Sequence, residues 1–186
     1  YELIRGNIVQ GKGDEWLVTQ AAGVHENSTR VFNGQGKFVR QLWPLSLNRP
    51  KERLEKFFGD TRWGAEDWDG NQVPNCINHN SRYWFSSALP RIVLSDGTVV
   101  GIQHGGGDAC LVFTMDGDGF PGQWCWCPPW YAGSGSVWSR VGFDKSIWEF
   151  AAGEQGDFHL WDKKKGILGR FRANDMSLLD KKEGAG

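Results

Sequence analysis

Apolar and polar residues alternate over much of this chain, and a period of two residues predicts β-strands. The clearest case is "RIVLSDGTVVGI" (91–102), where Asp96 and Gly97 separate two β-branched runs. An Asp-Gly pair in that position is a strong signal for a β-hairpin. Similar segments predict strands within 109–122 and at 136–143, 146–151, 157–161 and 167–172, with earlier ones near 2–9, 16–21, 30–33 and 37–42.

These predicted strands follow one another through short connections, which favours antiparallel pairing of sequence neighbours. We therefore predict an all-β fold, an antiparallel meander that closes into an up-and-down barrel, lipocalin-like in general shape. A β-sandwich or a small β-propeller are the alternatives. An irregular repeat supports the propeller: an aromatic residue, then Asn or Asp, then a turn with Gly, at Phe32-Asn33, Trp68-Asp69 and Trp161-Asp162. Ordinary hairpins in a Trp-rich chain would give the same repeat.

One segment departs from the strand pattern. In "NRPKERLEKFFGD" (48–60) the apolar residues gather on one side of a helix, Pro50 suits a first turn and Gly59 a stop. This predicts a short helix at about 50–58. We expect a single domain over 1–176 with ordered loops at 61–81 and 116–135, and a polar C-terminal tail at 177–186.

Several strands carry a large apolar side chain on each face, whereas a sheet with one wet face alternates cleanly between apolar and polar residues. The second face then needs a cover, supplied by loops of the chain or by another molecule. The residues predicted to face such a partner are Trp138, Trp148 and Trp161.

The most unusual stretch is "GQWCWCPPWYAG" (122–133), whose two prolines exclude its end from the interior of a sheet. In an extended chain the rings of Trp124 and Trp126 project to one side. The stretch therefore predicts a rigid aromatic shelf that binds a ligand; the alternative is that these rings cap one end of the core. The predicted ligand-binding residues are Trp124, Trp126, Trp130 and Tyr131, with Trp63 and Trp68 as a second wall.

Charge and composition narrow the function classes. The net charge is −1 and the isoelectric point is near 6.5, which argues against nucleic-acid binding driven by electrostatics. No apolar run approaches the roughly 18 residues of a membrane-spanning helix. The 11 Trp, 11 Phe and 26 Gly residues favour a turn-rich β protein. A first residue other than Met suits a mature chain, secreted or organellar rather than cytoplasmic.

Four cysteines allow disulfides, metal ligation or free thiols. Cys125 and Cys127 are too close for a good bond with each other, so possible disulfides join them to Cys76 or Cys110. The paired CxxC spacing of zinc sites is absent, and no metal or other cofactor is predicted. The segment "DGDGF" (116–120) resembles part of a calcium loop, but position twelve is not Glu, and an Asp-Gly turn is the favoured interpretation.

No catalytic motif is complete. "HGGGD" (104–108) resembles an oxyanion loop but lacks a nucleophile elbow elsewhere in the chain. Glu66 and Asp67 beside Trp68 could act on glycans. We expect a non-catalytic binding protein whose Trp-rich surface holds a planar, lipid-like or sugar ligand. The alternatives are an accessory subunit of a larger protein assembly and, second, a glycan hydrolase.

Overall fold

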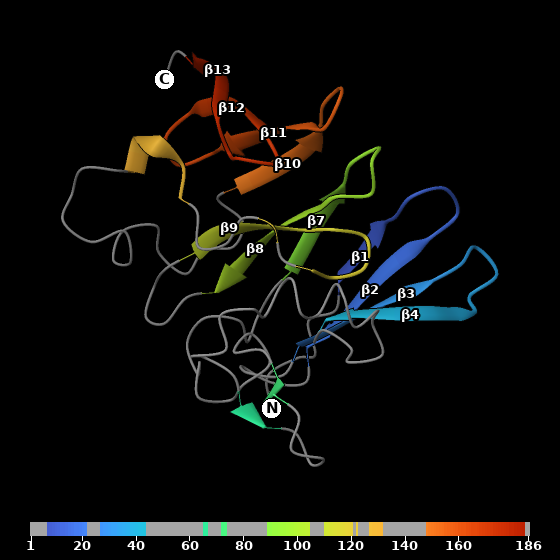
Figure 1. Cartoon of the computed structure of the whole chain (residues 1–186). Coiled ribbons are helices and arrows are strands. Elements are labelled where there is room, and N and C mark those ends of the chain that lie inside the picture. Colours follow the sequence, from blue (N-terminus) through green and yellow to red (C-terminus); the bar gives the residue numbers. More distant parts are fainter. Residues whose placement is uncertain are drawn as a thin grey trace.

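The computed structural model describes residues 7–21, 27–43, 65–66, 72–73, 89–104, 110–120, 122, 127–131 and 148–184. Over these ranges the fold is all-β, as predicted, apart from one 3₁₀ turn at Pro129–Tyr131 (Figure 1). The strands form three antiparallel sheets and one two-stranded ribbon, β5 (Ala65–Glu66) with β6 (Gln72–Val73).

The first sheet contains four strands in chain order, each paired with the next. They are β1 (Asn7–Gln10), β2 (Trp16–Ala21), β3 (Asn27–Phe32) and β4 (Phe38–Trp43). The side chains of Leu17 and Val31 point into the core, and those of Trp16 and Arg30 point away from it. This alternation is the two-residue period that the sequence shows.

The other two sheets repeat the same sequential pairing. The middle sheet contains β7 (Leu89–Val93), β8 (Val99–His104) and β9 (Cys110–Met115). The last sheet contains β10 (Trp148–Ala152), β11 (Asp157–Asp162), β12 (Ile167–Arg172) and β13 (Leu178–Glu183). Most of the predicted strands therefore form near their predicted bounds.

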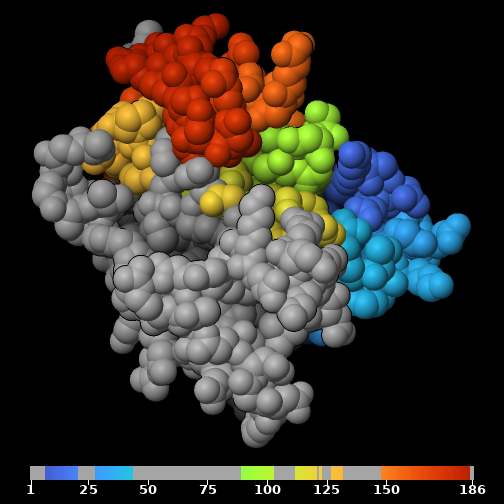
Figure 2. Space-filling model, in the orientation of Figure 1, coloured from blue at the N-terminus to red at the C-terminus, as the bar shows by residue number. Residues whose placement is uncertain are grey.

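The three sheets lie in a row, with the middle sheet between the other two. Strand β1 packs beside β7, and β7 packs beside β10, so the sheets meet through their first strands. The Asn7 side-chain amide donates a hydrogen bond to the Pro90 carbonyl and joins the first two sheets. Figure 2 shows the first sheet at one edge of the molecule and the last sheet at another. No closed barrel is formed by the described strands, so the barrel prediction is not supported.

The middle sheet is covered on both faces. On one face Val99 and Phe113 pack with Leu17 and Val31 of the first sheet. On the other, neighbouring residues of β8 and β9, with Val112 among them, join the core of the last sheet. A strand buried on both faces needs apolar residues at successive positions. The two-sided pattern of the segment 109–114 thus results from cover by the chain's own sheets.

Two predicted segments have a different outcome. The polar tail predicted at 177–186 contains β13, which pairs with β12 although all six of its side chains are exposed. An outer strand needs only backbone partners on one side, so its sequence carries little apolar signal. The predicted loop at 116–135 contains a tight hairpin turn and the 3₁₀ turn. The predicted helix at 50–58 and strand at 136–143 lie outside the described residues.

Candidate functional site

The hairpin turns of the first and middle sheets share one construction. The backbone N–H of Asn33 donates to the Lys37 carbonyl, and the N–H of Asp116 donates in the same way to the Phe120 carbonyl. One oxygen of each Asn33 or Asp116 side chain accepts two further N–H groups of its own turn, at 2.9 to 3.1 Å. The predicted Asp-Gly turn at 116–120 is confirmed, since the Asp116 side chain caps it by accepting the N–H groups of Asp118 and Phe120.

Neighbouring turns meet at the ends of the sheets. A Cβ built on Gly97, in the β7–β8 turn, would lie 3.8 Å from the Lys12 Cδ atom of the β1–β2 turn. A Cβ on Gly156, in the β10–β11 turn, would lie 3.8 Å from the Asp96 Oδ2 atom. Turns from all three sheets therefore lie side by side on one surface, which we call the hairpin face.

A cleft of about 440 Å³ opens on this face between the first and middle sheets. Its walls are charged and its floor is apolar, and both come from segments far apart in the sequence. The lining includes Lys12, Asp14, Glu15, Leu17, Arg40, Leu42, Asp96, Val99, Asp116 and Asp118.

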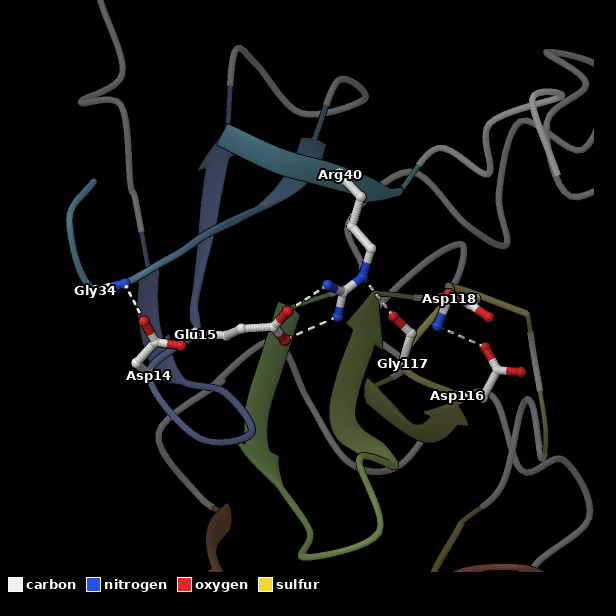
Figure 3. Close-up of polar contacts among 7 residues, drawn as sticks. All are labelled: Asp14, Glu15, Gly34, Arg40, Asp116, Gly117 and Asp118. Carbon is white, nitrogen blue, oxygen red and sulfur yellow. Dashed lines mark hydrogen bonds and ion pairs between the residues drawn. The ribbon is translucent and has the colours of Figure 1, made fainter. Parts of the chain in front are cut away.

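Arg40 is the central side chain of the cleft and projects from β4 toward the middle sheet (Figure 3). Its guanidinium makes a two-point ion pair with Glu15, with Nη2 donating to Oε2 at 2.9 Å. Its Nε donates to the Gly117 carbonyl at 2.8 Å, so one side chain joins β4, the β1–β2 turn and the turn after β9. The hydrogen bond to Glu15 raises the pKa of Arg40 above its usual value.

The backbone on the far side of Arg40 is fixed by close packing. Gly119 has a φ of +89°, and a Cβ at this position would lie 2.3 Å from the carbonyl oxygen of Leu42. Only glycine allows both this conformation and this contact. The turn after β9 is thereby held against β4, which sets the width of the cleft.

The cleft is acidic. Five of its lining side chains are carboxylates and two are cations, and one of the cations is bound to Glu15. Asp14 accepts the Gly34 N–H through Oδ2, and Asp96 accepts the Thr98 N–H through Oδ1. The second oxygen of each of these two carboxylates can accept a hydrogen bond from a ligand. The arrangement can therefore hold a group that is positively charged or rich in hydrogen-bond donors.

Two of the predicted ligand-binding residues pack at the core of the last sheet. Trp130 is half-buried against it, lies 5.6 Å, centroid to centroid, from the Phe171 ring, and donates from its indole to Asp162 Oδ2 at 2.9 Å. Tyr131 is only 9% exposed and meets Trp148 edge to face. This packing agrees with the alternative interpretation, in which the aromatic stretch caps a core, and the ligand-binding role stays a prediction.

Asp162 holds this aromatic end together. Its carboxylate is fully buried and accepts the indole N–H groups of both Trp130 and Trp148, as well as the Lys165 backbone N–H. Burial, with the help of this carboxylate, raises the pKa of the Tyr131 phenol.

The predicted partner-facing residues differ in position. Trp148 is 2% exposed and lies in the core, because that face of β10 is covered by the middle sheet and by Tyr131. Trp161 is half-buried on the opposite face of the last sheet. Five further predicted tryptophans lie outside the described residues: Trp63, Trp68, Trp124, Trp126 and Trp138.

The remaining candidate groups are only partly described. Cys127 is half-buried beside the core of the last sheet and Cys110 begins β9, whereas Cys76 and Cys125 lie outside the described residues. Their pairing therefore stays a prediction. Glu66 lies on β5 and Asp67 outside the described part, so the hydrolase alternative is untested.

Within the described ranges, no three His, Cys, Asp or Glu side chains come together in a group that could hold a metal ion. No helix in the same part of the chain combines the length and apolar character needed to cross a membrane.

The cleft has no signature in the sequence. Glu15 and Arg40 stand in ordinary strand-edge positions, and no motif joins them to residues 116–118. The only signal in the sequence was the repeated Gly-bearing turn. It predicted the positions of the hairpin turns but not which turns lie side by side in the fold. No protein-family model matches the sequence, and no curated protein is similar to it.

Proposed function

We propose that this protein is a non-catalytic binding protein that holds a small cationic ligand in the cleft of its hairpin face. One observation carries the proposal: a cleft of about 440 Å³ with carboxylates in excess over cations. Its walls are preorganised, because Asp14, Asp96 and Asp116 accept backbone N–H groups of the turns before any ligand arrives. Preorganised donors and acceptors cost little entropy on binding.

The ligand class follows from the lining. Arg40 neutralises Glu15 within the cleft, so the carboxylates of Asp14 and Asp96 face a mouth in which Lys12 is the remaining cation. An amine or guanidinium group satisfies those oxygens directly. Leu17 and Leu42 form an apolar floor that suits the short methylene chain of a diamine.

The arrangement of the sheets supports a binding role. Three sequential meanders that meet through their first strands are typical of the blades of a β-propeller, one of the two alternatives to the barrel. In such a fold the turns at one end gather on a common surface, and loops on a rigid scaffold are the usual place for binding residues. We therefore infer a propeller-like scaffold in place of the barrel.

Titration calorimetry with 1,4-diaminobutane tests the proposal. We expect saturable binding that weakens from 20 to 300 mM NaCl, because the attraction between charges is screened. Asp96→Asn should weaken binding several-fold. Glu154→Gln, which removes an exposed carboxylate of the β10–β11 turn outside the cleft lining, is the matched control and should bind like the wild type.

Cellobiose and an anionic planar dye serve as the competing ligand classes in the same titration. If cellobiose or the dye binds and the diamine does not, the result favours the aromatic shelf of Trp124 and Trp126 as the ligand site. The proposal fails if the diamine gives no heat of binding, or if Glu154→Gln weakens it as much as Asp96→Asn.

A further inference from the structure

Most of the exposed large apolar side chains in the described residues belong to the first sheet. Six large apolar side chains in the described residues are more than a third exposed. Four of them belong to this sheet: Ile8 at 66%, Trp16 at 42%, Phe38 at 53% and Val39 at 46%. Ile8, Trp16 and Phe38 lie on the face turned away from the middle sheet, which we call the outer face, and Val39 stands at the β-bulge between Phe38 and Arg40. Apolar groups gathered on one surface mark an interaction site.

The strand pairing joins these residues into two rows across the outer face. One row runs Gln10, Trp16, Phe32 and Phe38, and the other runs Ile8, Val18, Arg30 and Gln41. Within the first row the Phe32 and Phe38 rings pack edge to face with centroids 6.0 Å apart. The apolar side chains therefore form one continuous surface, and Arg30 is the single charged residue of the two rows.

The opposite face of the first sheet is already buried, and its packing shows what kind of surface covers an apolar face of this sheet. There Leu17, Val31 and Leu42 pack face to face on Val99 and Phe113 of another antiparallel sheet. Stacking of sheets about 10 Å apart is how apolar strand faces are usually buried. A second sheet is thus the natural cover for the outer face as well.

Among the described sheets, the first and the last each have an outward face, and the charges of these two faces differ. On the last sheet the corresponding rows are Glu149–Trp161–Leu168–Lys182 and Ala151–His159–Arg170–Asp180. These contain four charged side chains, which would have to lose water against an apolar partner. The outer face of the first sheet is nearly uncharged, so it matches itself better than it matches the last sheet.

We propose that two copies of this chain associate through the outer faces of their first sheets, related by a two-fold axis. Such an axis along the Trp16–Phe32 row places the two Arg30 side chains on opposite sides of the contact. Four strands about 4.8 Å apart present a face of roughly 300 Å² in projection, which is a small contact for a stable dimer. We therefore expect a weak dimer that dissociates on dilution.

Sedimentation velocity of the full chain between 5 and 500 µM tests this association. The weight-average sedimentation coefficient should rise with concentration, and the rise should persist in 0.5 M NaCl because the contact is apolar. Phe38→Lys and Ile8→Lys should each weaken dimerisation at least tenfold. Leu178→Lys, which adds the same charge at an exposed apolar position of β13, is the matched control and should leave it unchanged.

Circular dichroism of each variant serves as the test of folding. We expect all three variants to fold, because the substituted positions are exposed. A wild-type chain that stays monomeric to 500 µM would overturn the proposal. So would loss of association in 0.5 M NaCl, or equal weakening by Leu178→Lys. The diamine titration above depends on other residues, so the two proposals can fail separately.

Discussion

Replacement of Arg40 by Met gives a direct test of how the first and middle sheets are joined. The change keeps most of the aliphatic stem but removes three hydrogen bonds, two to Glu15 and one to the Gly117 carbonyl. Hydrogen bonds to charged groups contribute about 1.5–3 kcal/mol each before desolvation is considered. Both side chains of the pair are 23% exposed, so water replaces part of the loss.

We expect Arg40→Met to lower the free energy of unfolding by about 2–3 kcal/mol. Glu15→Gln should cost less, since Arg40 keeps its bond to Gly117. In a double-mutant cycle the two changes should couple by about 1–2 kcal/mol, above the range of exposed pairs. The measurement is urea unfolding followed by tryptophan fluorescence.

Arg172→Met is the control, because Arg172 pairs with Asp175 at 3.9 Å and both side chains are about half exposed, at 51% and 53%. That change should cost no more than about 1 kcal/mol. A coupling energy near zero, or equal costs for Arg40→Met and Arg172→Met, would mean that the Arg40–Glu15 pair does not hold the two sheets together.

Two further changes probe the last sheet. A Cβ on Gly169 would lie 2.7 Å from the Trp130 ring, so Gly169→Ala should destabilise the fold by about 1–3 kcal/mol in urea unfolding. An unchanged unfolding midpoint would show that the ring does not pack there. Hydrogen bonds from Ser177 lower the pKa of Asp175 below its ordinary 3.8. The ionised Asp175 carboxylate therefore stabilises the fold fully well above pH 3.8, and this stabilisation is lost as the pH falls through the lowered pKa. Urea midpoints between pH 5 and 2 should therefore fall less steeply in Asp175→Asn than in the wild type, and identical slopes would contradict the assignment.

Local pattern determined the strands. The Asp96-Gly97 turn, the alternation of Phe158 and Leu160 with polar neighbours, and the Asp-Gly turn at 116–120 each depend on residues within a few positions of one another. A two-residue period and a turn that needs a positive φ are visible in any single stretch of sequence. For this reason the all-β class and most strand positions could be predicted.

The tertiary structure alone decided how the sheets stack. The sequence pattern of a meander is the same whether its strands close into one barrel or divide into separate sheets. The reason is that each hairpin satisfies its backbone hydrogen bonds locally. Apolar residues on both faces of β9 indicated that a cover exists, but not that the chain supplies it from the first and last sheets.

The same distinction holds for the site. The aromatic residues of 122–133 looked like a binding surface because rings are conspicuous in a sequence, yet Trp130 and Tyr131 pack against the last sheet. The cleft depends on Lys12, Arg40 and Asp96, which meet only after two sheets have packed together. The sequence by itself determined where the chain extends and turns. Contacts between distant segments decided which surfaces face each other, since they depend on the packing of whole sheets.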